Sequence, residues 1–337
     1  MQANNPNNAH NTRAARAPVF VVGLSRSGTK LLRELLNRHP QVRIAPYESH
    51  FIPGLLKALG EKYPTIDESA RNEYIRRLKR TGFFKRMAQA GSLIDDETLH
   101  ALSLRETWPE VVEALFRHYV GAAHSDIIWG DKSPSYLFRM PQLLQHFPSA
   151  SFVHIIRDPR DRAGSAQEAW GANPLISSQR WLEGMTCAAR FSEAEPQHYH
   201  ALRYETLVTD TERVMRDVSR FLRIPFSSET CTLARAVENR GDRTNPTRRR
   251  RAVYAGNIGR HGSRWADSGL RRIEEIVFPI AGTLGYGPET SPTVHRPLSR
   301  KEWLLYLVGH HLAGLKPFVS RWSLVEGVKQ AWQRARS

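Results

Sequence analysis

A short segment near the N-terminus has the residue types and spacing of a phosphate-binding loop. It reads GLSRSGTK from Gly23 to Lys30, so small and hydroxyl-bearing residues surround Arg26. Backbone N–H groups in such a loop point toward a bound anion, and the helix that follows adds about half a positive charge at its start. Arg26 supplies a full positive charge. We therefore expect the phosphate end of a nucleotide here, against the alternative of a plain turn.

The same loop nearly matches the Walker A pattern of nucleotide triphosphatases, but its last two residues are exchanged. Thr29 precedes Lys30 in this chain, whereas the Walker pattern places the lysine first. One position turns a helical side chain by about 100°, so neither the lysine nor the hydroxyl reaches its Walker role. A P-loop kinase or NTPase is therefore kept only as an alternative function. A second alternative is a non-enzymatic basic protein that binds anionic lipid or nucleic acid.

A second anion site of the same construction is predicted around Arg157 and Ser165. These residues lie on either side of a predicted helix start, directly after an apolar stretch at 151–156. Two such sites at one sheet edge suit a nucleotide that is phosphorylated at both ends, whereas ATP needs only one. The alternative for this segment is a salt-bridged helix start without a ligand.

The elements that must position these residues follow a repeated strand-then-helix order. Such alternation predicts an α/β fold, a P-loop-NTPase-like three-layer arrangement with a central parallel sheet. Ligands bind at the carboxyl ends of the strands in these sheets, and the polar clusters fall at those ends. Residues 52–125 are mainly helical by periodicity and predict an insertion between two strands. The predicted strands span 19–22, 41–45, 127–129, 151–156 and 201–204.

Composition favours anionic partners and excludes several protein classes. Lys and Arg number 49 against 33 acidic residues, a net charge of +16. Two cysteines far apart, Cys187 and Cys231, make a disulfide framework or zinc site improbable and favour a reducing compartment. No stretch reaches the roughly 18 apolar residues of a membrane span. We expect a cytoplasmic protein with a disordered tail at 1–17, one domain at 18–287 and a basic amphipathic tail at 288–337.

Four segments, in the correct order, resemble sulfotransferases that use 3′-phosphoadenosine 5′-phosphosulfate (PAPS). They are SRSGTKLLRELLNRHP, FVHIIRDPRDRAGSA, LRYETL, and GNIGRHGSRW with the helix that follows. The resemblance implies that the first loop binds the 5′-phosphosulfate, the second segment the 3′-phosphate, the third the adenine, and the fourth covers the nucleotide. The implied PAPS-binding residues are Arg26, Ser27, Gly28, Thr29, Lys30, Arg157, Ser165, Tyr204, Gly259 and Arg260.

The resemblance also implies the catalytic roles. Glu48 would take the proton of the acceptor hydroxyl, with His50 as the rival base. Lys132, in GDKSPSY, would face the bridging oxygen, and with Arg26 it would offset charge on the leaving phosphate. His50 and Tyr136 are assigned to the acceptor side. No metal is implied, and the motifs lie closer to glycan and tyrosyl-protein sulfotransferases than to cytosolic aryl sulfotransferases, which favours a glycan or glycolipid acceptor.

Two basic segments keep open functions. Arg248 to Arg251 could bind an acidic acceptor or a lipid headgroup, but a solvated loop explains them equally well. Nucleic acid is not expected as a partner, because no aromatic residues of the kind that stack bases accompany the arginines. The tail at 288–337 has an apolar band beside lysines and arginines. It could contact a membrane surface, the domain itself or a second copy of the chain in a homodimer.

Overall fold

The structure is a computed structural model, and it describes residues 17–122, 126–233, 253–291 and 294–313. The chain divides into two compact units, which are treated separately below. The first comprises residues up to Arg157 together with Thr186–Gly256, and the second comprises Asp158–Met185 together with Asn257–Ser337. The predicted tail at 1–17, apart from its last residue, the arginine run at 248–251 and the end of the C-terminal tail lie outside the described residues.

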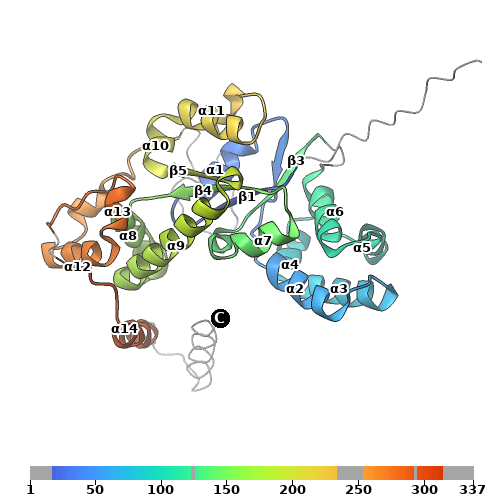
Figure 1. Cartoon of the computed structure of the whole chain (residues 1–337), viewed down its shortest axis with the longest axis horizontal. Helices are drawn as coiled ribbons and strands as arrows, with labels where there is room; N and C mark the ends of the chain where they lie inside the picture. The colour runs from blue at the N-terminus through green and yellow to red at the C-terminus, as the bar shows by residue number, and fades with distance from the viewer. Residues whose placement is uncertain (1–16, 123–125, 234–252, 292–293, 314–337) are drawn as a thin grey trace, which may run out of the picture. The chain divides into compact units, whose positions relative to one another are not determined.

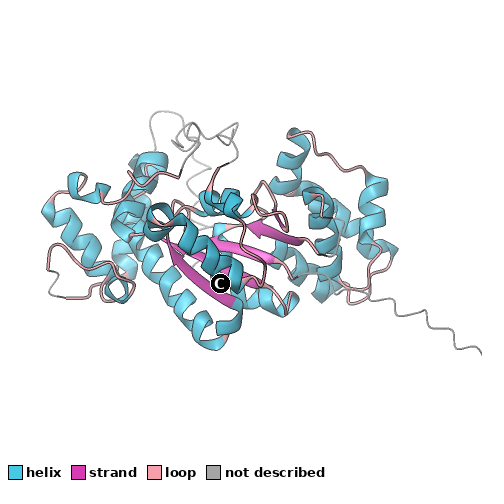
Figure 2. Cartoon of the chain, turned by 90° about the horizontal axis from the view of Figure 1, so that it is seen from above, coloured by secondary structure: helices cyan, strands magenta, loops and turns pink. Residues whose placement is uncertain are grey.

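The first unit is built on a five-stranded sheet in which every pair of neighbouring strands is parallel. The strand order is β2-β3-β1-β4-β5, with the earliest strand at the centre. Figure 1 labels β1, β3, β4 and β5, and Figure 2 shows the strands in magenta with helices around them. The predicted parallel α/β sheet is therefore confirmed. The strands are β1 (Val19–Gly23), β2 (Val42–Ile44), β3 (Ile128–Lys132), β4 (Ser151–Ile156) and β5 (Tyr199–Arg203).

Side chains alternate along the strands and give the sheet two different faces. The aliphatic face includes Val19, Val21, Val153 and Ile155, and it packs with α1 (Thr29–Leu36), α10 (Tyr204–Thr209) and α11 (Thr211–Phe221). The opposite face is aromatic. Phe20 lies 5.5 Å from Phe152, 6.1 Å from Trp129 and 5.8 Å from Phe147 between ring centroids. Helices thus cover both faces, as the three-layer prediction requires.

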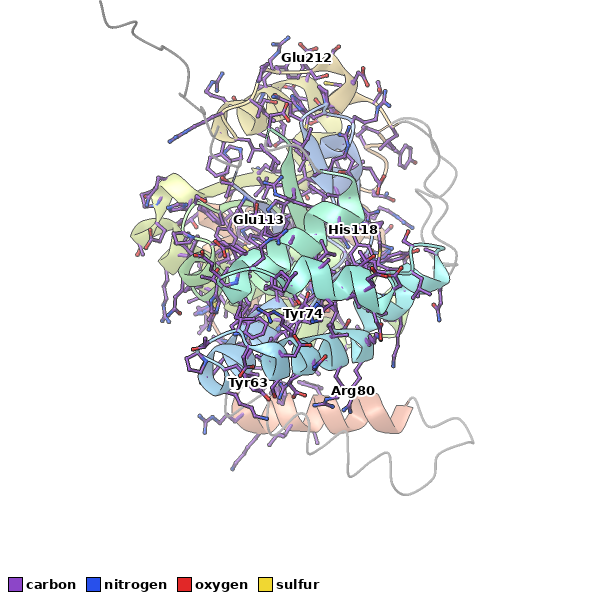
Figure 3. All side chains as sticks on the ribbon, turned by 90° about the vertical axis from the view of Figure 1, so that its right-hand side faces the viewer. Tyr63, Tyr74, Arg80, Glu113, His118 and Glu212 are labelled. Atoms are coloured by element: carbon purple, nitrogen blue, oxygen red, sulfur yellow. The ribbon has the colours of Figure 1, made fainter. Side chains whose placement is uncertain are left out.

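Five helices fill most of the predicted insertion between β2 and β3. Three begin at side-chain caps, namely Asp67, Thr81 and Asp95, and one begins at a capping box formed by Thr107 and Glu110. Figure 3 views this insertion, with Tyr63, Tyr74, Glu113 and His118 labelled. The helices are α2 (Ile52–Lys62), α3 (Glu68–Arg80), α4 (Gly82–Gln89), α5 (Asp96–Ser103) and α6 (Trp108–Val120).

Aromatic contacts join the insertion to the sheet. Phe116 of α6 lies 5.2 Å from Trp129 of β3, and Phe83 of α4 stacks on Phe116 at 5.4 Å. Phe83 also contacts Phe51, at 5.7 Å, in the segment that leaves β2. The insertion is therefore packed directly against the segment that follows β2, where Glu48 lies.

The second unit is helical in its described residues. A short 3-10 helix, η5 (Arg260–Ser263), precedes α12, and α9 passes from this unit into the first at Thr186. None of the described helices is long and apolar enough to cross a membrane. The helices are α8 (Pro159–Trp170), α9 (Pro174–Ala194), α12 (Asp267–Val277), α13 (Ile280–Thr283) and α14 (Arg300–Ala313). The remaining elements of the described residues belong to the first unit and are α7 (Met140–His146) and the 3-10 helices η1 (Pro134–Phe138), η2 (Pro196–His198) and η3 (Ser228–Cys231).

Two of the differences from the predicted strand ends involve residues of the predicted site. β3 continues through Asp131 and Lys132, whereas the apolar pattern predicts an end at Trp129. Tyr204 is the first residue of α10 and does not end β5. In β3 the polar side chains have partners far away in the chain: Ser49 Oγ donates to Asp131, and Glu48 pairs with Lys132.

Candidate active site

The loop after β1 has the backbone of an anion cradle. Gly28, the residue before α1, has φ 100°, and no side chain caps the helix there. The backbone turns between Leu24 and Ser27, whose N–H donates to the Leu24 carbonyl at 3.1 Å. Arg26 lies within this turn with φ 74°, a left-handed conformation uncommon for arginine. The first N–H groups of a helix have no partner within it, so those of α1 are oriented for an anion.

Arg157 and Tyr204 both contact this loop. Arg157 Nη1 donates to the backbone oxygen of Arg26 at 3.1 Å, and its guanidinium lies 4.7 Å from the Tyr204 ring centroid. The Tyr204 ring packs closely against Gly28 of the loop, since a Cβ built on Gly28 would lie 2.6 Å from Tyr204 Cδ2. Three segments predicted to bind one nucleotide thus meet at one edge of the sheet.

Glu48 and Lys132 form an ion pair one strand away from this loop. Lys132 lies beside Val21 in the β1–β3 register, and its ammonium contacts Glu48 Oε1. The lysine side chain is 2% exposed and the glutamate side chain 27%. Glu48 Oε2 is 2.7 Å from His50 Nε2. The structure therefore brings together two of the three predicted catalytic residues, Glu48 and Lys132, and the rival base His50.

The surroundings of this pair set its protonation. Burial alone would raise the pKa of Glu48, but the hydrogen bond from His50 and the charge of Lys132 outweigh it and lower that pKa to about 2. Burial lowers the pKa of Lys132 from its ordinary value, although the Glu48 carboxylate opposes this change. Arg33 of α1, whose guanidinium donates to the Pro46 carbonyl, adds a second positive charge near Lys132.

Tyr136 lies in the interior of the fold. Its side chain is buried at 2% exposure, and its hydroxyl lies 2.6 Å from Ser49 Oγ and accepts from the Ile52 N–H at 3.0 Å. The hydroxyl is thus surrounded by protein groups, and the assignment of Tyr136 to the acceptor stays a prediction. His50 is exposed, with its Nδ1 3.0 Å from Ser135 Oγ.

The remaining predicted nucleotide contacts belong to the second unit. There Asp161 accepts from the N–H groups of Gly259 at 2.7 Å and His261 at 2.8 Å, which fixes the turn that carries Arg260. Arg260 is paired with Glu168 at 3.7 Å. Ser165 lies on α8, five residues before its end.

His261 is the centre of a buried ionic cluster in this unit. Its Nδ1 is 2.9 Å from Asp161 Oδ1 and its Nε2 is 2.8 Å from Glu289 Oε1. Burial would lower the pKa of His261, but the hydrogen bonds to the two carboxylates outweigh it and raise that pKa to about 9. His261 is therefore an imidazolium at neutral pH.

Sequence reasoning missed three residues around Glu48. Ser49 and Asp131 are hydrogen-bonded to each other at 2.9 Å, and Arg86 of α4 donates to the Glu48 carbonyl at 3.1 Å. Asp131 could be suspected only as the neighbour of Lys132, and Ser49 only as the neighbour of Glu48. No spacing in the sequence indicates Arg86. Among the described residues there is no group of three His, Cys, Asp or Glu side chains that could hold a metal ion.

Comparison with known proteins places the chain in one family. A profile described as "Sulfotransferase family" matches residues 18–228. Protein-tyrosine sulfotransferase 1 of Danio rerio is 26% identical over 292 residues, covering 81% of this chain and 73% of the relative. Nodulation protein NoeE of Sinorhizobium fredii is 27% identical over 192 residues, covering 56% of this chain and 40% of the relative. The chain thus spans less than half of that second relative.

A solved structure shows the same fold. The sulfotransferase domain of the Synechococcus PCC 7002 olefin synthase aligns with a TM-score of 0.55 at 19% identity, over 82% of this chain and 97% of that domain. The chain belongs to the sulfotransferase family. The predicted α/β fold and the predicted enzyme, a PAPS-dependent sulfotransferase, are thereby confirmed.

Proposed function

We propose that the chain transfers a sulfuryl group from PAPS to a hydroxyl of a glycan or glycolipid and releases adenosine 3′,5′-bisphosphate. The observation that carries the proposed roles is the ion pair between Glu48, in the segment after β2, and Lys132, on the strand next to β1. Transfer to a hydroxyl acceptor is supported by family membership. The similarity to a protein-tyrosine sulfotransferase makes a tyrosyl peptide the competing acceptor.

In the proposed reaction the acceptor oxygen attacks sulfur in line, while the bond from sulfur to the 5′-phosphate oxygen breaks. Glu48 takes the acceptor proton, with His50 as the alternative base. Lys132 and Arg26 offset the charge that grows on the leaving phosphate. Because Lys132 helps to hold the pKa of Glu48 at about 2, a shift of its ammonium toward that phosphate would make Glu48 a stronger base.

The nucleotide is proposed to bind along the loop after β1. The backbone from Ser27 to Lys30 would hold the 5′-phosphosulfate, Arg157 the 3′-phosphate and Tyr204 the adenine. Contact of Arg157 and Tyr204 with the loop supports this arrangement. The roles of Ser165, Gly259 and Arg260 stay predictions.

Calorimetric titration tests the nucleotide assignment directly. Adenosine 3′,5′-bisphosphate should bind without magnesium and more tightly than Mg-ATP, whereas the reverse order would favour a P-loop kinase or NTPase. Binding of neither would favour a non-enzymatic basic protein.

Mass spectrometry tests the acceptor. Glycans, glycolipids and tyrosyl peptides incubated with PAPS are screened for a gain of about 80 Da, the mass of an added SO₃.

Lys132→Ala should reduce turnover far more than the affinity for PAPS, because charge on the leaving phosphate develops only in the transition state. Equal losses in both would make Lys132 a simple binding residue.

The cellular location is proposed to be cytoplasmic, with peripheral membrane contact through the segment at 288–337. In its described part Leu304 is 51% exposed and Leu305 is 70% exposed beside Arg300 and Lys301. Apolar side chains next to basic ones suit an anionic membrane surface. A homodimer that covers the same residues is the competing arrangement.

A further inference from the structure

A buried polar network lies next to the proposed catalytic pair. Ser49 Oγ donates to Asp131 Oδ2 at 2.9 Å and lies 2.6 Å from the Tyr136 hydroxyl. The Ser133 hydroxyl accepts from the Ser49 N–H at 3.0 Å. All four side chains are 4% exposed or less, and Tyr136 packs against Phe20 at 6.2 Å in the aromatic layer. The network therefore lies inside an apolar part of the fold.

The network members are the chain neighbours of the proposed catalytic residues. Ser49 directly follows Glu48, and Asp131 directly precedes Lys132. Successive side chains of a strand point to opposite faces, so Asp131 and Lys132 leave β3 on different sides. The segment after β2 is thus joined to β3 twice, by the Ser49–Asp131 hydrogen bond and by the Glu48–Lys132 ion pair.

Such a network is costly as a purely structural device. Burial raises the pKa of Asp131 to about 6, although hydrogen bonds from Ser133 and Ser49 oppose it. Asp131 Oδ1 has no hydrogen-bond partner in the described structure. A buried carboxylate with incomplete hydrogen bonding destabilises a fold relative to apolar side chains. His50, the residue after Ser49, has φ 57°, so the segment after β2 also carries backbone strain.

We propose that Ser49, Asp131 and Tyr136 are positioning residues for sulfuryl transfer, which fix the backbone of Glu48 against that of Lys132. The inference rests on the proposed function, because it needs Glu48 and Lys132 to act in the reaction. It assigns Tyr136 to the support of the site instead of the acceptor. Loss of a network hydroxyl should let the Glu48 segment shift and misplace the base, since small displacements lower rates strongly.

The test separates turnover from nucleotide binding in two matched pairs of variants. Tyr136→Phe removes the network hydroxyl, and Tyr74→Phe removes a hydroxyl that is buried without a hydrogen-bond partner. Ser49→Ala is matched by Ser103→Ala, whose buried hydroxyl donates only to the His100 carbonyl at 2.7 Å. For each variant the release of sulfate from PAPS to water, the affinity for adenosine 3′,5′-bisphosphate and the unfolding midpoint are measured.

We expect Ser49→Ala and Tyr136→Phe to slow sulfate release by roughly 10- to 100-fold with nucleotide affinity within about 2-fold of wild type. The two controls should keep wild-type turnover. Equal losses of turnover and affinity, or turnover tracking the unfolding midpoint across all four variants, would overturn the inference. If Glu48→Gln leaves sulfate release intact, the proposed role of Glu48 as the base is wrong, and the positioning role that depends on it is wrong as well. If Glu48→Gln abolishes release while both network variants are fully active, the positioning role alone is wrong.

Discussion

Replacing Glu48 with glutamine removes one partner of a largely buried ion pair. The Lys132 side chain is 2% exposed, so the variant leaves an ammonium in the interior without its carboxylate. The pKa of Glu48 falls from 4.5 to about 2 in the fold. At about 1.4 kcal/mol per pKa unit, that difference corresponds to about 3 kcal/mol of folding free energy at neutral pH. The value agrees with the roughly 3–5 kcal/mol typical of breaking a buried pair.

We expect Glu48→Gln to lower the unfolding midpoint of the unliganded protein by about 6–12 °C, since 1 kcal/mol corresponds to roughly 2–4 °C in large domains. Glu48→Gln combined with Lys132→Met should recover most of the loss, because no unpaired charge is left in the interior. Glu113→Gln is the matched control. Its carboxylate is 28% exposed and pairs with Arg117 within one helix, a contact worth about 0.5 kcal/mol.

The pH dependence gives the second half of this test. A carboxyl with a lowered pKa stabilises the fold above its unfolded pKa, and that contribution is lost as the pH falls toward its folded pKa. The midpoint difference between wild type and Glu48→Gln should therefore be constant from pH 7.5 to 5.5 and shrink below about pH 4.5. Differential scanning fluorimetry measures it. An unchanged midpoint at pH 7.5, or a double variant no more stable than the single one, would refute the reasoning.

Three further outcomes are expected. Gly28→Ala should weaken binding of adenosine 3′,5′-bisphosphate at least about 10-fold by calorimetry, because the new Cβ meets the Tyr204 ring and φ is 100°; unchanged affinity would contradict the cradle. The pKa of His261 is raised from 6.5 to about 9 in the fold, so its ion pair with Asp161 stabilises the protein fully below about pH 6.5, and this contribution should be lost as the pH rises from about 6.5 to about 9; His261→Gln should abolish that loss in thermal unfolding. Deleting residues 298–337 should abolish flotation with anionic liposomes; equal flotation of both proteins would exclude this segment as the membrane contact.

The parallel sheet was predictable from the sequence because local patterns encode it. The apolar run before Gly23 and the polar cluster after each predicted strand fix both the parallel sheet and the edge that carries the site. The sequence pattern predicts too short a β3, because Asp131 and Lys132 are polar residues in a buried strand. Their partners, Ser49 and Glu48, lie more than eighty positions away in the chain. A short stretch of sequence does not indicate contacts between residues so far apart in the chain.

Candidate site residues could be named from the sequence where they stand in short local motifs, but their tertiary contacts could not. Glu48, Lys132 and the loop around Arg26 stand in short motifs, and the structure places Glu48 beside Lys132. Tyr136 stands in the same kind of motif, but its hydroxyl is taken up by Ser49, which the motif does not contain. Burial decides between contact with a ligand and support of the site, and burial is a property of the whole fold.

The hydrogen bond from Arg86 to the Glu48 carbonyl has a practical consequence for chimeras that transfer acceptor specificity from one sulfotransferase to another. A chimera that swaps only the helices from Ile52 to Val120 would discard Arg86 while keeping the segment it holds. The transplanted α4 would then face the native Glu48 segment without the hydrogen bond that Arg86 donates to it. Moving the boundary back to the end of β2 carries both halves of the contact across together.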